Sequence, residues 1–361
     1  MSLHFHRLTV KEVKKETPEC VSVLFDVPEN LQHDFQFSQG QSLTLRTTIN
    51  GEEIRRNYSI CSSPLENKLK VAIKKVEGGL FSSFANELLK KGDVLDVMPP
   101  VGKFNTPLHP ENKKNYLAFA AGSGITPVIS LIKTTLATEK HSRFTLVFGN
   151  RNRNSIIFFE ELEALKNQYM ERFSLVHILS RERMDTDLNF GRISQEKLEE
   201  LDRLEDFTGT DEFFICGPTE MIFTVKAFLE KKGIAGNKIH LELFNSTKSP
   251  QTTVSNESGV ASQESGAVSH ITVKVDGRSF EMSIPFSSNT NILDAALQQG
   301  ADLPYACKGG MCCTCKAKLL EGEVSMDVHW GLEEEEVAKG YILTCQSHPK
   351  TEKVVVDFDA K

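Results

Sequence analysis

Four of the eight cysteines in this chain lie within nine residues, and this cluster constrains the fold more than any other feature of the sequence. Disulfide scaffolds are usually short secreted chains whose cysteines are spread along their length. A clustered set in a chain of 361 residues instead indicates a metal site in a reducing compartment. The clustered residues are Cys307, Cys312, Cys313 and Cys315.

The spacing of these cysteines predicts an iron–sulfur site. Residues 307–315 read CKGGMCCTC and contain the pattern C-x4-C-x2-C, and another cysteine follows later in the chain. This is the ligand spacing of plant-type [2Fe–2S] proteins, and soft thiolate ligands suit iron. Gly309 and Gly310 permit the backbone angles of a loop that turns its N–H groups towards the sulfurs. The expected ligands are Cys307, Cys312, Cys315 and Cys345.

A structural zinc site is the alternative for the same residues. Such sites usually show two C-x2-C pairs, whereas here only Cys312 and Cys315 form one. Cys313 would break the spacing if it were a ligand, so we interpret it as a small filler residue. We interpret Cys20 and Cys61 as structural thiols.

Charge and hydropathy exclude several classes of protein. A formal net charge of -7 and a pI near 5.9 argue against nucleic-acid binding through phosphate contacts. The most apolar run, residues 116–132, contains Gly, Ser, Thr and Pro and falls short of the roughly 20 apolar residues that a membrane span needs. The first twenty residues lack the apolar core of a secretion signal. We therefore expect a cytoplasmic protein that binds neither nucleic acid nor membrane.

Residues 245–269 are predicted to form a flexible linker. They are rich in Ser, Thr, Gly and Gln and contain no aromatic residue, so little in them offsets the entropy of ordering. Residues 270–361 form the acidic part, with 9 Lys and Arg against 14 Asp and Glu.

The long N-terminal part contains two different patterns of hydrophobic residues. Residues 1–110 show period-two runs separated by turn residues, which predict an antiparallel β-barrel or sandwich, with a helix at Ser82–Lys91. Residues 111–244 alternate apolar strands with helices, which predicts an α/β domain with a parallel sheet. Ligands of such sheets bind beyond the carboxyl ends of the strands.

The tail, residues 270–361, opens with two predicted strands, His270–Val275 and Ser279–Ile284, joined through Asp276 and Gly277. A helix is predicted at Asn291–Gln299, directly before the cysteine loop.

Two motifs in the first domain suit a flavin nucleotide. In the run Arg56-Asn57-Tyr58-Ser59 the Arg can neutralise a diphosphate, the Tyr ring can lie against a flavin and the Ser hydroxyl can bond a ring nitrogen. Gly79 and Ser82 lie at a glycine turn that opens a helix, where exposed N–H groups attract anions. The alternatives are an ordinary surface strand and a simple helix cap by Ser82.

The second domain carries a glycine-rich turn between a strand and a helix. Residues 120–127 read AAGSGITP, which is not the common G-x-G-x-x-G fingerprint, and Pro127 is predicted to begin the helix. Cys216, Gly217 and Pro218 end a later strand, where glycine permits the close approach of a planar ring. The alternative for Cys216 is a buried structural thiol.

Arginines after the second and third strands of this domain favour NADPH over NADH. An NAD site commonly places an acidic residue after its second strand. Here that position reads GNRNR, with Arg151, and SRER with Arg181 follows the next strand. Guanidinium groups suit a 2′-phosphate, and solvated surface charge is the alternative.

Taken in order, RNYS, GGLFSSF, AAGSGITP, CGP and CKGGMCCTC resemble a ferredoxin–NADP reductase module fused to a C-terminal plant-type ferredoxin. The resemblance covers the whole chain apart from the linker. It implies a FAD-binding β-barrel at 1–110, a NAD(P)-binding α/β domain at 111–244 and a β-grasp α+β ferredoxin domain at 270–361. Within this group the chain most resembles the reductase components that serve phenylacetyl-CoA epoxidase.

The resemblance also implies a function and a set of roles. Electrons would pass from NADPH to FAD, to the [2Fe–2S] cluster and then to an oxygenase component, here the di-iron epoxidase of phenylacetate catabolism. Ser59, Thr126 and Cys216 would lie at the reacting rings, and Glu242 and Phe244 beside the flavin. The other implied cofactor contacts are Arg56, Asn57, Tyr58, Gly79 and Ser82 for FAD and Gly122, Gly124, Arg151, Arg181, Gly217 and Pro218 for NADPH.

Two alternative functions stay open at this point. The same electron transfer can serve another oxygenase, for example one that hydroxylates steroids or hydrocarbons. The chain can also be a zinc-stabilised interaction protein without enzymatic activity.

Overall fold

The computed structural model describes residues 4–184, 186–244 and 268–360. The chain divides into two compact units, one that extends to Phe244 and one that comprises the C-terminal part. Most of the predicted linker, 245–267, lies outside the described residues. Its last two residues belong to the first strand of the second unit.

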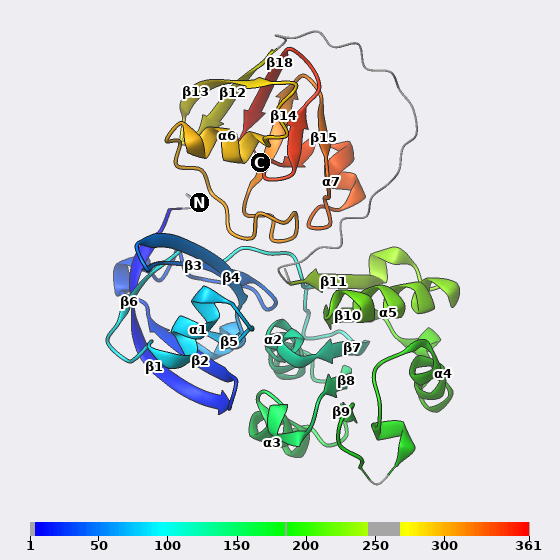
Figure 1. The fold of residues 1–361 in the computed structure, drawn as a ribbon. Helices are drawn as coiled ribbons and strands as arrows, with labels where there is room; N and C mark the ends of the chain where they lie inside the picture. The colour runs from blue at the N-terminus through cyan, green and yellow to red at the C-terminus, as the bar shows by residue number, and fades with distance from the viewer. Residues whose placement is uncertain (1–3, 185, 245–267, 361) are drawn as a thin grey trace. The chain divides into compact units, whose positions relative to one another are not determined.

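The first unit begins with a six-stranded antiparallel barrel, as predicted (Figure 1). The strand order is β4-β3-β6-β1-β2-β5, and a bridge between Ile60 and Val71 joins the two ends of the sheet. Apolar side chains such as Leu8, Val23 and Leu43 fill the interior. The strands are β1 His6–Thr17, β2 Cys20–Asp26, β3 Ser42–Ile49, β4 Glu52–Ser59, β5 Leu69–Lys74 and β6 Val94–Val97.

The helix of the barrel domain, α1, is Leu80–Glu87 rather than the predicted Ser82–Lys91. The backbone N–H groups of Leu88 and Leu89 both bond to the carbonyl oxygen of Phe84, at 2.9 and 3.1 Å, which ends the regular helix. The predicted stop, Gly92, instead adopts φ +93° in the turn before β6.

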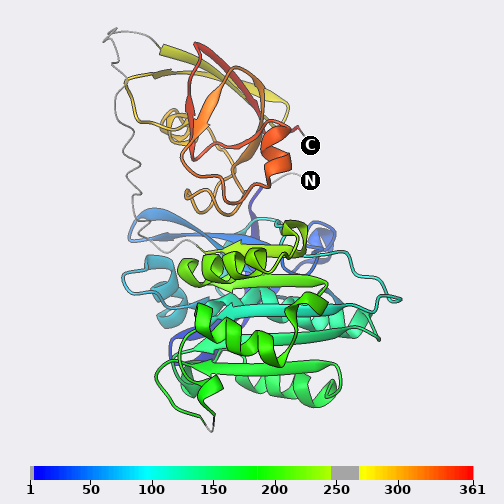
Figure 2. The same cartoon turned by 90° about the vertical axis from the view of Figure 1, so that its right-hand side faces the viewer.

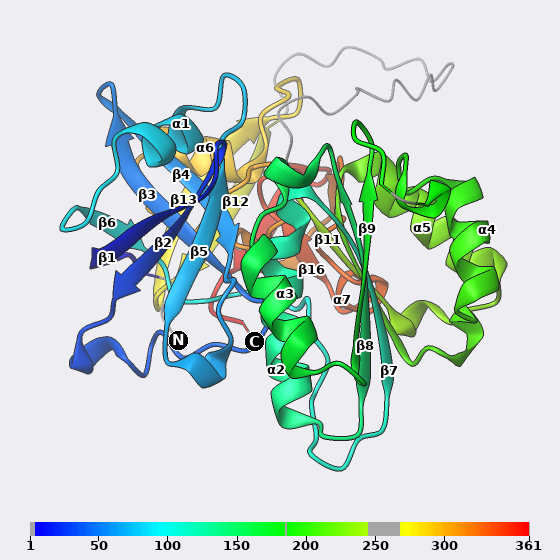
Figure 3. The ribbon, with the colours of Figure 1, turned by 90° about the horizontal axis from the view of Figure 1, so that it is seen from below.

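A five-stranded parallel sheet forms the rest of the first unit (Figure 2). The strand order is β11-β10-β7-β8-β9. Helices α2 and α3 cover the face towards the barrel, and α4 and α5 cover the other face (Figure 3). The strands are β7 Asn115–Ala121, β8 Arg143–Asn150, β9 Phe173–Leu179, β10 Glu212–Gly217 and β11 Ile239–Leu243. The helices are α2 Ile125–Thr138, α3 Phe159–Gln168, α4 Gln195–Leu204 and α5 Thr219–Lys231.

Two details of this domain differ from the sequence-based expectation. Helix α2 begins at Ile125, after a 3₁₀ turn at Gly122–Gly124, so Pro127 is its third residue and not its first. Strand β11 was not predicted, although its sequence IHLEL alternates with period two and pairs in parallel with β10.

The second unit is a small mixed sheet with helices α6 and α7 packed beside it, the predicted α+β fold. Its main sheet has the order β13-β12-β18-β14-β16, with β12 and β18 parallel. Asn291 caps helix α6 by accepting a bond from the Asp294 N–H at 2.8 Å. The elements are β12 Val268–Val275, β13 Arg278–Pro285, α6 Ile292–Gln298, β14 Lys316–Glu321, β15 Val324–Met326, α7 Glu334–Ala338, β16 Tyr341–Leu343, β17 Ser347–Pro349 and β18 Lys353–Asp357.

Short 3₁₀ turns connect many of these elements. They are η1 Glu29–Leu31, η2 Pro64–Glu66, η3 Gly122–Gly124, η4 Arg153–Ser155, η5 Asp187–Asn189, η6 Phe207–Gly209 and η7 Gly236–Lys238. Among the described residues, every helix is too short or too polar to cross a bilayer.

Candidate functional site

Strands β3 and β4 present a buried polar face with unsatisfied hydrogen-bonding atoms. In the antiparallel register Ser42 lies opposite Ser59 and Thr44 opposite Asn57. Thr44 Oγ1, Asn57 Oδ1 and Ser59 Oγ are buried and have no hydrogen-bond partner among the described residues. Buried polar atoms are rarely left unpaired, because each costs about 1–3 kcal/mol. This face therefore fits a ligand that carries many polar groups, as FAD does.

Tyr58 and Arg56 lie on the other side of β4, because side chains alternate along a strand. The Tyr58 ring packs against Phe81 of α1 with centroids 5.5 Å apart, and burial raises its pKa. The Arg56 side chain is exposed and donates to the Arg55 carbonyl oxygen at 2.7 Å. Because β4 is the last strand in the sheet order, a ligand along its outer edge is within reach of both sides.

The turn before α1 does not contain the simple Ser82 cap that was considered. Gly79 is the N-cap residue, and no side chain caps the helix. The Ser82 hydroxyl instead accepts from the Val76 N–H at 3.1 Å and donates to the Gly79 carbonyl oxygen at 3.2 Å. Ser82 thus holds the turn in place and leaves the first N–H groups of α1 without a side-chain acceptor, which suits an anion.

The glycine-rich turn after β7 meets the end of β10 at very short range. A β-carbon on Gly124 would lie 2.0 Å from the carbonyl oxygen of Cys216. A β-carbon on Gly217 would lie 3.1 Å from the Ala121 N atom. The Thr126 hydroxyl, which is buried, donates to the Ser123 carbonyl oxygen at 3.0 Å and braces the same turn. The structure thus brings Gly122, Gly124, Thr126, Cys216, Gly217 and Pro218 together at the carboxyl ends of β7 and β10.

Cys216 and Glu242 are neighbours across β10 and β11. Burial raises the pKa of the Cys216 thiol, and Glu242 raises it further. Burial also raises the pKa of Glu242 to about 8. Phe244 packs against the apolar cluster that contains Cys216. The two residues predicted to lie beside the flavin therefore lie at the same end of the sheet as the glycine turn.

The predicted phosphate arginines lie side by side beyond β8 and β9. The Arg181 N–H donates to the Arg151 carbonyl oxygen at 2.8 Å. Both side chains are exposed, and their guanidinium groups form no ion pair with the described residues. Arg153, by contrast, stacks on Phe159 at 4.7 Å. The geometry thus leaves Arg151 and Arg181 available for a phosphate.

Sequence reasoning missed two residues of this region. Thr44 carries one of the unpaired atoms, and the Asn50-Gly51 turn, with φ values of +53° and +84°, was the signal that would have placed it opposite Asn57. Lys74 at the end of β5 stands beside the glycine turn, since a β-carbon on Gly122 would lie 3.6 Å from its Nζ. No motif in the sequence pointed to it.

The four predicted cluster cysteines are arranged as two pairs. Cys315 Sγ lies 3.2 Å from Cys345 Sγ, and the side chains of Cys307 and Cys312 are joined by a hydrogen bond. Hydrogen bonding within each pair lowers the pKa of Cys307 and Cys345 and raises that of Cys312 and Cys315. No three potential ligands among the described residues converge on a single point. Two thiol pairs suit a two-iron cluster, in which each iron takes two protein ligands.

The surroundings of these thiols also fit a cluster. The Gly309 N–H points to Cys307 Sγ at 3.3 Å, and the Cys307 N–H points to Cys312 Sγ at 3.5 Å. The Thr314 hydroxyl is buried beside Cys312 and stabilises its thiolate, because a hydrogen bond from Thr314 lowers the pKa of Cys312. Cys313 adopts φ +56° and donates its thiol to the Gly331 carbonyl oxygen, as expected of a residue that is not a ligand.

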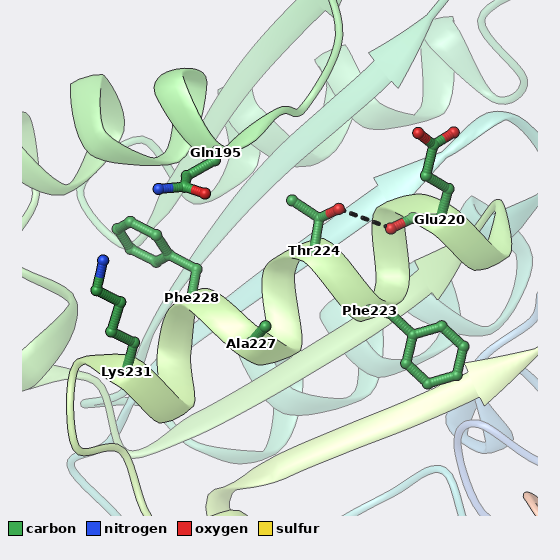
Figure 4. Close-up of a pocket in the computed structure, with 7 residues that line it drawn as sticks. All are labelled: Gln195, Glu220, Phe223, Thr224, Ala227, Phe228 and Lys231. Carbon is green, nitrogen blue, oxygen red and sulfur yellow. Dashed lines mark hydrogen bonds between the residues drawn. The ribbon is translucent and has the colours of Figure 1, made fainter.

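A hollow of about 510 Å³ lies elsewhere, between the start of α4 and the outer face of α5 (Figure 4). None of the predicted site residues lines it. Its lining residues are Gln195, Glu220, Phe223, Thr224, Ala227, Phe228 and Lys231.

Three family models match successive parts of the chain. The oxidoreductase FAD-binding domain matches residues 7–106, the oxidoreductase NAD-binding domain matches 119–227 and the 2Fe-2S iron-sulfur cluster binding domain matches 273–350. The cofactors are therefore FAD, NAD(P)H and a [2Fe–2S] cluster, and the zinc alternative is set aside.

Known proteins resemble the chain along its whole length. A component of 1,2-phenylacetyl-CoA epoxidase from Escherichia coli is 47% identical over 99% of this chain and 98% of its own length. The ferredoxin reductase component of 3-ketosteroid-9-alpha-monooxygenase from Rhodococcus rhodochrous is 34% identical over 97% and 96%. The solved structure of phthalate dioxygenase reductase shares the fold, with a TM-score of 0.58, 23% identity and 98% of each chain covered. The chain belongs to the family of oxygenase reductases that join a FAD-binding, a NAD-binding and a [2Fe–2S] domain in one polypeptide.

Proposed function

We propose that this chain passes electrons from NADPH through FAD and its [2Fe–2S] cluster to the oxygenase component of a phenylacetyl-CoA epoxidase. The observation that carries the choice of partner is the end-to-end likeness to the epoxidase component from Escherichia coli. When bound, FAD accepts an electron pair from a reduced nicotinamide and releases single electrons, which a [2Fe–2S] cluster takes one at a time.

In this proposal the chain contributes position and electrostatics. Ser59 and Asn57 of β4 and Thr44 of β3 satisfy the polar groups of FAD, and Tyr58 shields the ring from water. Arg56 neutralises the diphosphate together with the uncapped end of α1 near Gly79 and Ser82. The support is the set of unpaired buried atoms on β3 and β4.

The nicotinamide enters at the turn after β7. Glycines 122, 124 and 217 permit its close approach, while Thr126 and Cys216 border the ring and Glu242 and Phe244 border the flavin. Pro218 follows β10 and is the N-cap residue of helix α5. Arg151 and Arg181 hold the 2′-phosphate, which makes NADPH the preferred donor.

The cluster is held by Cys307, Cys312, Cys315 and Cys345, two thiolates for each iron. N–H groups of the loop stabilise the anionic sulfurs, as the Gly309 contact indicates. The acidic character of residues 270–361 favours a basic docking face on the oxygenase.

We also infer domain boundaries near residues 110, 244 and 269 and a cytoplasmic location. The boundaries are supported by the gap between β6 and β7 and by the division of the chain after Phe244. The location is supported by the crowding of four cysteines into residues 307–315, a pattern typical of a metal site in a reducing compartment.

A second candidate partner is a steroid hydroxylase, favoured by the 34% identity to the ketosteroid monooxygenase reductase. Purified chain is combined with the oxygenase components of each system, and NADPH-dependent product formation is measured. Turnover of phenylacetyl-CoA and not of a 3-ketosteroid is expected, and the reverse result would overturn the choice of partner.

A further inference from the structure

Helix α2, which begins at the nicotinamide turn, carries a buried polar stripe on its barrel-facing side. Ser130 and Thr134 are buried in a helix whose other buried residues are mainly apolar. Ser130 Oγ donates to the Ser62 carbonyl oxygen at 2.7 Å. Thr134 Oγ1 donates to the Ser130 carbonyl oxygen at 2.6 Å, so the 2.9 Å contact with Ser63 is donated by Ser63.

Lys133 completes this stripe, since residues three and four apart share a helix face. Its side chain is only 7% exposed, and Nζ pairs with Glu66 of the barrel domain at 3.0 Å and with Glu161 of α3. Nζ also donates to the Cys61 carbonyl oxygen at 3.4 Å. Lys70 of β5 lies 3.7 Å from Glu161, so charges of both signs come from both domains. Burial alone would raise the pKa of Glu161, but Lys133 and Lys70 together lower it.

The contacted barrel segment directly continues the flavin strand. Cys61 follows Ser59 by two residues, and its N–H is fixed to the Lys70 carbonyl oxygen at 2.8 Å. On the other side, Thr126 and Ser130 are separated by about one helical turn, roughly 6 Å at 1.5 Å per residue. The stripe is therefore a short, packed connection between the two cofactor-binding segments, and α2 lies between barrel and sheet (Figure 3).

A buried lysine is a poor way to gain stability, because removing two charges from water costs about as much as their attraction returns. Its benefit is a fixed geometry, since a misplacement of about 1 Å between reacting groups can lower a rate by up to about a hundredfold. We propose that Ser130, Lys133 and Thr134 form a clamp that sets the nicotinamide turn against the flavin strand, with Lys133 as a positioning residue for hydride transfer. This inference rests on the proposed function, in which oxidised FAD takes a hydride from NADPH and NADP⁺ is released.

The test uses the FAD-loaded, full-length chain. Lys133→Met removes the charge at similar length, and Ser130→Ala removes one bond of the clamp at little cost in packing. Lys140→Met is the matched control, because Lys140 is exposed just beyond the end of α2. Anaerobic rapid mixing with NADPH measures the limiting rate of flavin bleaching, the NADPH dissociation constant and the charge-transfer absorbance between the two rings. Deuterated NADPH gives the isotope effect.

Lys133→Met should lower the limiting rate about tenfold, weaken the charge-transfer band and raise the isotope effect, with little change in NADPH affinity. Ser130→Ala should show the same pattern more weakly, and Lys140→Met should match the wild type. Wild-type rates and bands in both clamp variants, with only a lower Tm, would overturn the proposal. If NADPH fails to bleach the flavin of the wild-type chain, the proposed function is overturned as well. That outcome differs from a failure of the clamp alone, because Lys140→Met would then also show no bleaching.

Discussion

The carbonyl oxygen of Cys216 occupies the place that a side chain on residue 124 would need. A β-carbon built on Gly124 falls 2.0 Å from that oxygen and 2.8 Å from the Gly217 N atom. The 3₁₀ turn that follows β7 thus packs against the end of β10 through a glycine.

Gly124→Ala should therefore push the turn away from β10. Overpacking of this kind costs about 1–3 kcal/mol, and we expect a lower Tm together with a loss of NADPH-dependent flavin bleaching. Gly236→Ala is the matched control, because nothing lies within 4 Å of a β-carbon at that position. Equal activity in the two variants would contradict the close approach as a requirement for nicotinamide binding.

Cys345→Ser should abolish the cluster and leave the flavin reaction intact. Cys345 lies 3.2 Å from its partner thiol in a unit separate from the flavin strand. The expected result is a protein without most of its iron and sulfide and without the paramagnetic signal of a reduced cluster. NADPH should still bleach its flavin at the wild-type rate.

Cys313→Ser provides the control for that experiment. The Cys313 thiol donates to the Gly331 carbonyl oxygen, and a serine hydroxyl can make the same bond. The cluster signal should persist. Loss of iron in Cys313→Ser but not in Cys345→Ser would reverse the ligand assignment.

The architecture could be predicted because each domain has its own characteristic sequence pattern. Period-two runs marked the barrel, alternating strands and helices marked the parallel sheet, and the cysteine spacing marked the tail. The exact first and last residues of the helices were harder to predict. Pro127 looked like a first residue because proline is common there, but Gly122–Gly124 forms a 3₁₀ turn that lets α2 begin at Ile125.

Site residues could be predicted where they belong to one short sequence motif. They could not be predicted where they come together only through the pairing register of two strands. Ser59 and Asn57 belong to one short run, but Thr44 joins them only through the pairing of β3 with β4. Lys133 gave no signal at all, since a lysine within a helix is ordinarily a solvated surface residue. Its partners, Glu66 and Glu161, come from distant segments that only the folded chain brings together.

Arg181→Ala should weaken the binding of NADPH more than that of NADH. The Arg181 side chain is exposed, its backbone is bonded to Arg151, and its guanidinium has no ion-pair partner among the described residues, so in the proposed function its removal deletes only a phosphate contact. A charge-assisted bond at an exposed site corresponds to about a tenfold change in the NADPH dissociation constant, or ~1.4 kcal/mol. Arg143→Ala, at the opposite end of β8, should change neither affinity. Equal losses for both nucleotides would rule out the phosphate role.

Glu242 should make the stability of the first unit depend on pH. Burial raises its pKa from 4.5 to about 8, so between these values the folded chain keeps a proton that the unfolded chain has lost. The stabilisation is complete below about pH 4.5 and is lost as pH rises towards 8. Glu242→Gln stays neutral at every pH. Its Tm at pH 8.5 should therefore be a few degrees above that of the wild type, on the order of 1 kcal/mol after allowance for partial solvent access.

That difference in Tm should shrink as the pH falls to 5. Glu220→Gln, which changes an exposed residue of α5, should show no such trend. A Tm difference for Glu242→Gln that is constant from pH 5 to 8.5 would show that the carboxyl group is ionised in the folded chain throughout.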